Sequence, residues 1–121
     1  MTPTGFENAI PILRVEDLAS SLDYYVNRLG FEIDWNDPGM ASVSRGHSVI
    51  MLCEGEQGNR GTWIWVGVED VAALFEEYRA SGAKISMEPV NYTWAYEMRV
   101  EDPDGHVLRL GSEPLGDIAT V

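Results

Sequence analysis

The chain of 121 residues carries four tryptophans, whose type and spacing suggest one kind of chemistry, stacking on a flat ring. Trp63 and Trp65 stand two residues apart in an apolar run. Side chains of a β-strand alternate between its faces, so both indoles are expected on one surface. Trp35 ends one expected strand and Trp94 directly precedes another. The set predicts an aromatic surface for a planar ligand; the alternative is that the rings fill a core.

The charge of the chain narrows the classes of partner. It has 20 acidic and 8 basic residues, a formal net charge of -12 at pH 7. A surface this negative repels nucleic-acid phosphates and anionic lipid headgroups, which argues against nucleic acids and membranes as partners. It attracts cationic small molecules. The start of the chain lacks the features of a signal peptide, and no apolar run approaches ~18 residues, so we expect a cytoplasmic protein. The lone Cys53 is expected to be buried.

A short motif occurs twice and organises the rest of the chain. Residues 15–19 (VEDLA) recur as residues 68–72 (VEDVA), and Tyr25 recurs as Tyr78, all at one constant offset. A short apolar run typical of a strand precedes each copy, and each copy opens a helix. Asp17 is expected to cap the start of the first helix and Gly30 to end it. Asp70 and Gly82 are expected to do the same for the second helix.

The pattern predicts strand, helix and three strands, written twice. Expected strands are 9–13, 31–35, 40–44, 48–53, 63–66, 84–92, 95–101 and 107–110. The fold class is α+β: two βαβββ modules, about 8–54 and 62–112, form a curled mixed sheet around a concave cleft, with the helices on the outer face. Residues 55–61 link the modules of this single domain, and 113–121 form a flexible tail. Function is expected at the cleft.

The chain resembles the vicinal oxygen chelate superfamily, which includes glyoxalase I, extradiol dioxygenases and bleomycin resistance proteins. The resemblance spans about residues 9–113 and is carried by residues 12–15 (ILRV), 27–31 (NRLGF) and 101–106 (EDPDGH). It supports the doubled fold. One fold hosts lyases, oxygenases, transferases and simple binding proteins, so the resemblance alone does not give the chemistry.

Metal-dependent members of that superfamily hold their ion with four His or Glu side chains, one from the first and one from the last strand of each module. The matching positions here are Ile10, Met51, Trp63 and Arg109. None of them is a plausible ligand for a divalent cation. His47 and His106 lie at strand starts, four and three residues before the ligand positions Met51 and Arg109. We therefore expect a protein without a metal or other cofactor.

Within the superfamily the chain is most similar to the metal-free bleomycin resistance proteins. The shared residues are 9–13 (AIPIL), 28–31 (RLGF), 34–35 (DW), 63–66 (WIWV) and 94–97 (WAYE). Those proteins are acidic dimers that sequester a cationic antibiotic, stacking its flat rings on aromatic side chains while acidic groups receive its tail. The resemblance implies that the ligand-binding residues include Trp35, Trp63, Trp65, Trp94, Asp34 and Glu97.

Three further residues bear on this resemblance. Met40 stands where the resistance proteins often have Phe, and we count it among the ligand-binding residues. Arg109 is a cation expected in the cleft, where it either pairs with an acid such as Glu97 or receives an anionic group of the ligand. Pro11 removes a backbone donor from the first strand, and in the resistance proteins a Pro there accompanies exchange of that strand between subunits. We therefore expect a homodimer.

Two main classes of function remain open on the sequence, beside a ligand-binding domain with an unknown regulatory or housekeeping role. The first is a metal-free binding protein that sequesters a planar cationic small molecule such as a bleomycin-type antibiotic. The second is a superfamily enzyme, lyase- or dioxygenase-like, with a displaced metal site or with Glu97, Tyr96 or Arg109 as acid, base or oxyanion partner.

Overall fold

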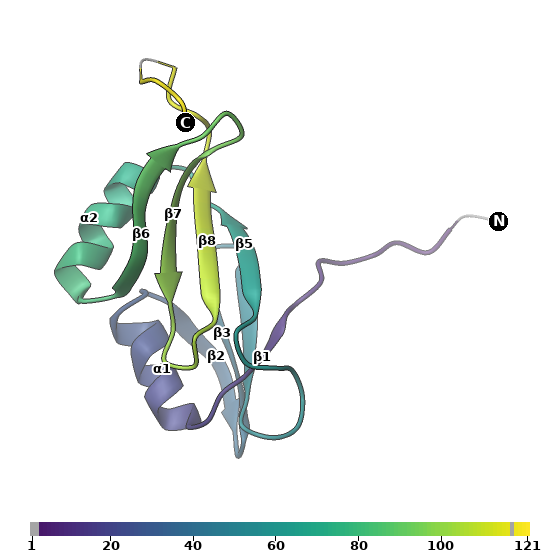
Figure 1. The fold of residues 1–121 in the computed structure, drawn as a ribbon. Coiled ribbons are helices and arrows are strands. Elements are labelled where there is room, and N and C mark those ends of the chain that lie inside the picture. Colours follow the sequence, from purple (N-terminus) through teal and green to yellow (C-terminus); the bar gives the residue numbers. More distant parts are fainter. Residues whose placement is uncertain (1–2, 117) are drawn as a thin grey trace.

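The computed structural model describes residues 3–116 and 118–121, and it confirms the doubled βαβββ order (Figure 1). The elements are β1 (Ile12–Arg14), α1 (Leu18–Asn27), β2 (Glu32–Asp37), β3 (Met40–Arg45), β4 (Ser48–Cys53), β5 (Trp63–Gly67), α2 (Val71–Ser81), β6 (Lys84–Asn91), β7 (Tyr96–Glu101) and β8 (Val107–Ser112). Among the described residues, no helix is long and apolar enough to cross a membrane.

Each module builds its own four-stranded mixed sheet. The strand orders are β1-β4-β3-β2 and β5-β8-β7-β6, and the first strand of each module runs parallel to its last. Ile12 pairs with Met51 in the first sheet, and Trp65 pairs with Arg109 in the second. Ile12 and Trp65 are separated by the same offset as the repeated motif, so the repeat marks true structural equivalents.

The helix boundaries largely follow the predicted signals. In α2, Asp70 accepts a hydrogen bond from the Ala73 N–H (3.0 Å), and Gly82, at φ 82°, ends the helix in the left-handed conformation. In α1, the predicted N-cap Asp17 makes no side-chain hydrogen bond to the backbone of the helix. The Asp17 carboxylate accepts from the Ser20 hydroxyl, and Glu54 instead accepts the Leu18 N–H (2.8 Å). The first module thus caps its helix with a residue that lies beyond β4.

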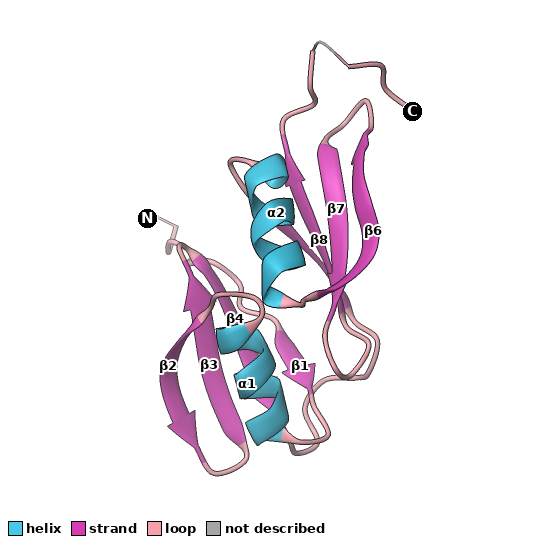
Figure 2. Ribbon diagram, turned by 90° about the vertical axis from the view of Figure 1, so that its left-hand side faces the viewer, coloured by secondary structure: helices cyan, strands magenta, loops and turns pink. Residues whose placement is uncertain are grey.

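Both helices cover the same side of the molecule, and the two sheets follow one another along its length (Figures 1 and 2). The core packs between helices and sheets, around Leu13, Tyr25, Leu52, Tyr78 and Leu108. Cys53 is buried, as predicted. The other face of each sheet is left uncovered. The predicted α+β fold of two βαβββ modules is confirmed, and the two sheets are not closed into a barrel.

The N-terminal segment departs from the body of the fold (Figure 1). The strand expected at 9–13 begins only at Ile12, although the Pro11 carbonyl still accepts from the Met51 N–H (3.0 Å). Residues 3–10, here called the arm, are all exposed, and Phe6 is 96% exposed. Near the other end of the chain, the side-chain amide of Asn91 donates hydrogen bonds to the carbonyls of Leu115 and Ile118 and accepts one from the Leu115 N–H. The flexibility expected of the tail stays a prediction.

The turn that precedes β8 joins the two modules. The ring of His106 is fully buried; its Nδ1 accepts from the Thr62 N–H (3.0 Å), and its Nε2 lies 2.6 Å from the Arg14 carbonyl. Asp102 accepts from the hydroxyl of Tyr25 on α1 (2.9 Å), and burial raises the pKa of this carboxyl above its usual value. His106 thus ties β1 to the linker, which is a structural task.

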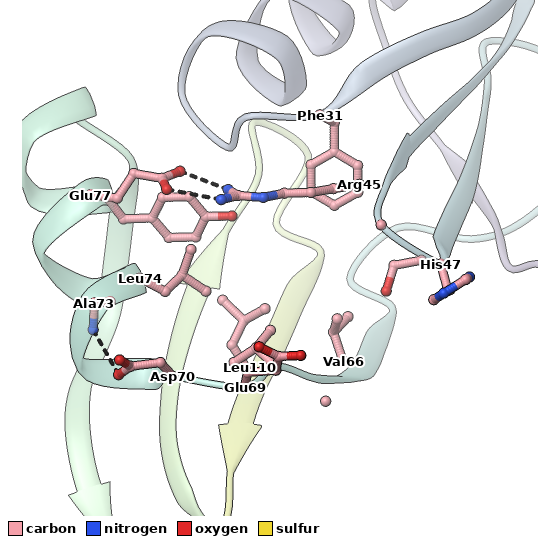
Figure 3. Close-up of a pocket in the computed structure, with 15 residues that line it drawn as sticks. Phe31, Arg45, His47, Val66, Glu69, Asp70, Ala73, Leu74, Glu77 and Leu110 are labelled. Carbon is pink, nitrogen blue, oxygen red and sulfur yellow. Dashed lines mark hydrogen bonds and ion pairs between the residues drawn. The ribbon is translucent and has the colours of Figure 1, made fainter.

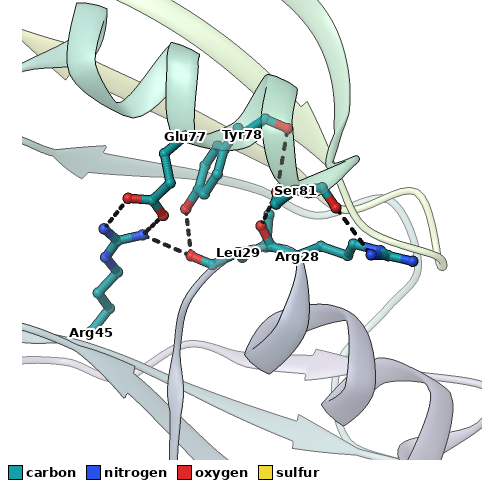
Figure 4. Close-up of polar contacts among 6 residues, drawn as sticks. All are labelled: Arg28, Leu29, Arg45, Glu77, Tyr78 and Ser81. Atoms are coloured by element: carbon teal, nitrogen blue, oxygen red, sulfur yellow. Dashed lines mark hydrogen bonds and ion pairs between the residues drawn. The ribbon is translucent and has the colours of Figure 1, made fainter.

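A second polar junction lies between the ends of the two helices (Figure 4). Arg45 binds both carboxylate oxygens of Glu77 (2.6 and 2.8 Å) and the Leu29 carbonyl (2.9 Å). The Tyr78 hydroxyl donates to the same carbonyl (2.8 Å), and burial raises the pKa of Tyr78 to about 12. These bonds fix the second helix against the first module.

The contacts of His106 between the modules predict that its loss destabilises the protein. Replacing His106 by Ala leaves two backbone groups without partners in the interior, and this should lower the free energy of unfolding by about 3 kcal/mol. Urea denaturation followed by circular dichroism measures the loss. The matched control is His47→Ala, because His47 is exposed and its loss should cost less than about 0.5 kcal/mol. Equal stability of the two variants would contradict the assigned role of His106.

Candidate functional site

The uncovered face of the second sheet gathers most of the predicted ligand-binding residues. Trp65 of β5 pairs with Arg109 of β8, and Arg109 pairs with Arg99 of β7. Two residues further along β8, Gly111 pairs with Glu97. Residues paired in this way share one face of a sheet. The register therefore sets two arginines and one carboxylate beside the indoles.

Glu97 is the fixed point of this face, with a side chain that is 0% exposed. It accepts hydrogen bonds from Arg109 Nε (2.7 Å) and Nη2 (2.9 Å), from Arg99 Nε (3.2 Å) and from Trp94 Nε1 (3.3 Å). The bidentate contact with Arg109 is the main reason that the pKa of Glu97 is lowered to about 2, with Arg99 and Trp94 adding to it against the effect of burial. Glu97 is therefore ionised at neutral pH and is a poor general base.

Each arginine also covers part of an indole. The guanidinium carbon of Arg99 lies 5.2 Å from the ring centre of Trp63, and that of Arg109 lies 5.2 Å from the ring of Trp65. Both distances are in the range of cation–π attraction. The two indoles remain 56% and 49% exposed. They are oriented by the arginines and still present free aromatic surface.

Gly111 allows Trp65 to lie down on the sheet. A Cβ atom added at Gly111 would collide with atoms Cη2 and Cζ2 of the Trp65 ring. The indole thus occupies the space that any larger residue at this position would fill. This glycine shapes the aromatic surface through its missing side chain.

A shallow pocket of about 470 Å³ lies between Trp65 and Trp94. Trp94 is 57% exposed and stacks on Tyr92, with ring centres 4.4 Å apart and planes within 8°. The remaining polar lining includes two acids, Glu69 and Glu113, and no basic residue. The pocket combines flat aromatic surface with a negative rim.

The first module holds the other predicted residues separately. Asp34, on β2, accepts hydrogen bonds from the hydroxyls of Ser42 (3.1 Å) and Ser44 (2.7 Å) on β3. Trp35 is 39% exposed, and Met40 begins β3 half-buried. In the described part of the chain, no hydrogen bond, ion pair or ring contact joins these residues to the tryptophans of the second module. One chain presents two separate halves of the predicted site.

The positions that match the superfamily's metal ligands do not carry donor atoms suited to a divalent cation. They bear an alkyl group (Ile10), a thioether (Met51), an indole (Trp63) and a guanidinium (Arg109). Among residues 3–116 and 118–121, no group of three or more His, Cys, Asp or Glu side chains could hold a metal ion. Both ring nitrogens of His106 already face backbone groups. The donor set does not fit a metal.

Sequence reasoning missed three residues of this face. Arg99 follows Glu97 by two positions on β7, so strand alternation was a usable signal for it. Tyr92 and Gly111 gave no such signal, because their roles depend on how neighbouring indoles pack.

A larger pocket, of about 520 Å³, lies on the helix side between the modules (Figure 3). Its walls include Phe31, Val66 and Leu74, and the Arg45–Glu77 pair borders it. None of the predicted ligand-binding residues lines it. This pocket and the one between Trp65 and Trp94 share Gly67, Val68 and Glu69 in their linings.

Comparison with known proteins gives one family and a consistent fold. The sequence model of the glyoxalase/bleomycin resistance protein/dioxygenase superfamily matches residues 8–110. A probable lactoylglutathione lyase of Vibrio cholerae is 26% identical over 117 residues, covering 82% of this chain and 85% of the relative.

Solved structures agree with this match. The bleomycin-binding protein of Streptomyces verticillus, solved with copper(II)-bleomycin, is 28% identical, with a TM-score of 0.77 over 91% of this chain and 98% of that one. TnmS3, an antibiotic-binding protein from Streptomyces sp. CB03234, has a TM-score of 0.80 and 20% identity over 93% of this chain and 100% of that one, a likeness of fold.

The lowered pKa of Glu97 predicts a pH-dependent stability. Glu97→Gln should destabilise the protein at near-neutral pH, because the amide cannot pair with both arginines. The ion pairs contribute fully above pH 4.5 and are lost as the pH falls toward about 2, so the difference in free energy of unfolding between wild type and variant should shrink over that range. Urea denaturation at a series of pH values measures it.

The matched control is Glu76→Gln, which removes an exposed carboxylate paired with Arg79. Its effect should be small at every pH. A Glu97→Gln difference that stays constant down to acid pH would contradict the assignment.

Proposed function

The chain belongs to the glyoxalase/bleomycin resistance protein/dioxygenase superfamily, and we propose that it is a metal-free member that binds and sequesters a planar aromatic small molecule with a cationic part, such as a bleomycin-type antibiotic. The observation that carries the proposal is the set of exposed indoles on the uncovered face of the second module, Trp63, Trp65 and Trp94. Large aromatic surfaces left open to water mark binding sites. A flat ring stacked on an indole contributes on the order of 1–3 kcal/mol.

The charge of the pocket supports the cationic part. Glu69 and Glu113 line the same pocket as Trp65 and Trp94, with no base among the lining residues. The net charge of -12 acts in the same direction by steering cations toward the protein. The bleomycin-binding protein of Streptomyces verticillus, with the same fold at 28% identity, supports an antibiotic as the class of ligand.

An enzyme of the superfamily is the alternative, favoured by the likeness to a probable lactoylglutathione lyase. The residues that would run a metal-free version are poorly suited to it. The carboxylate of Glu97 is ion-paired, with a pKa of about 2, and the ring of Tyr96 packs against the core. Ile10, Met51, Trp63 and Arg109 do not supply the donors that a metal-dependent version requires.

We also propose that the working form is a homodimer in which the arm is exchanged near Pro11. The arm leaves the body of its own chain, and Phe6 finds no cover there. The uncovered face of each sheet is unpartnered within one chain, so a second copy could bring the first-module face, with Asp34 and Trp35, opposite the tryptophans. The site would then be shared between subunits.

Tryptophan fluorescence tests the binding proposal. Bleomycin should quench the emission in a saturable way, at one ligand per chain. Trp65→Ala and Trp94→Ala should each weaken binding roughly fivefold or more, because each removes a stacking surface. The control is Phe75→Leu on α2, which removes an aromatic ring outside the site. If saturating drug leaves the emission unchanged, the antibiotic assignment fails.

Light scattering after size exclusion tests the assembly. The wild type should have twice the chain mass of 13.5 kDa, and a variant lacking residues 1–10 should be monomeric with unchanged circular dichroism. A concentration-independent monomer mass for the wild type would refute the dimer.

A further inference from the structure

We infer that this face prefers planar ligands whose ring carries an anionic oxygen at its edge, a carboxylate or an ionised hydroxyl, which a subsite made of Arg99 and Arg109 would bind. The inference rests on the proposed function and deepens it, because it adds a chemical group to the planar ligand. It assigns a binding role to Arg99, and it gives Arg109, which pairs with Glu97 as one of its two expected roles had it, the other role as well.

The first observation is the placement of the two arginines. Arg99 and Arg109 are direct partners across β7 and β8. Like charges directly opposite each other in a sheet are destabilising. Lysines and arginines number only eight in the chain, and two of them lie opposite each other here. Glu97 supplies one negative charge between them, so the trio keeps one net positive charge.

The second observation is the set of donors that remains. Arg109 uses Nε and Nη2 on Glu97, and Arg99 uses only Nε. Among the described residues, Nη1 and Nη2 of Arg99 and Nη1 of Arg109 make no hydrogen bond to the protein. Their side chains are 28% and 32% exposed, so a ligand can reach them. A free guanidinium fork matches the two oxygens of a carboxylate.

The third observation links these donors to the stacking surface. Each guanidinium lies over the indole next to it, Arg99 over Trp63 and Arg109 over Trp65. A ring that stacks on the exposed remainder of either indole brings its edge to the guanidinium N–H groups. An acidic substituent at that edge would complete the hydrogen bonding of the arginines.

The remaining charges on this part of the protein do not cancel the subsite. Lys84 and Glu101, on the same sheet, pair with each other (3.0 Å). Glu69 and Glu113 line the pocket next to Trp94, on the side where the ligand's cationic part is proposed to lie. Screening at physiological salt limits the reach of the overall negative charge to about 8 Å, so local groups decide which end binds where. The face is therefore polarised, with a cationic and an anionic end.

Two matched probes test the inference: anthraquinone-2-carboxylate and its neutral carboxamide, titrated by tryptophan quenching. The wild type should bind the carboxylate roughly tenfold more tightly than the carboxamide. Arg99→Gln should remove this preference, so that the affinities of the variant for the two probes come within about twofold of each other. The control Arg79→Gln, an exposed arginine on α2, makes the same change in net charge and should leave the preference intact.

The outcomes separate the two proposals. Equal affinity of the wild type for both probes, or an unchanged preference in a folded Arg99→Gln protein, overturns the anionic subsite and leaves stacking in place. Absence of quenching by either probe and by bleomycin overturns the subsite together with the proposed function. The preference of the wild type needs no variant, so it tests the inference even if Arg99→Gln does not fold.

Discussion

The buried carboxylate of Glu97 is the interaction on which the arrangement of the aromatic face depends. It orients Arg109 by two hydrogen bonds and Arg99 by one, and those guanidinium groups in turn lie over Trp65 and Trp63. Two arginines directly opposite each other would repel without it. A buried carboxylate without its arginines would be equally unfavourable. Glu97, Arg99 and Arg109 therefore stabilise this arrangement only together, and together they orient the indoles of Trp63 and Trp65.

The fold makes this face available because both helices cover the same side of the sheets (Figure 2). The apolar side chains of α1 and α2 pack on that side, which leaves the other side of each sheet free for polar and aromatic groups. The turn around His106 and the Arg45–Glu77 pair hold the modules together through backbone groups. Most of the site is thus carried on strands, whose side-chain directions are well defined, and Tyr92 and Trp94 lie in the connection between β6 and β7.

Much of this could be predicted from the sequence, where the signal is local or repeated. The doubled motif gave the order of elements, Asp70 and Gly82 bounded α2 as expected, and alternation placed Trp63 and Trp65 on one face. Other features depend on contacts between distant segments. Glu54 caps α1 from beyond β4, and Gly111 makes room for Trp65 from a neighbouring strand. No local pattern encodes such pairings, nor the fact that the two sheets stay open within one chain.

The central claim is that the uncovered face of the second module is where a planar ligand stacks. Nuclear magnetic resonance of the four indole N–H groups tests it most directly, with signals assigned by single Trp→Phe variants and anthraquinone-2-carboxylate as the probe. The account predicts that the signals of Trp63, Trp65 and Trp94 shift and saturate together with a single binding constant. If these three signals stay in place while other resonances of the protein move, the ligand binds elsewhere and the account is contradicted.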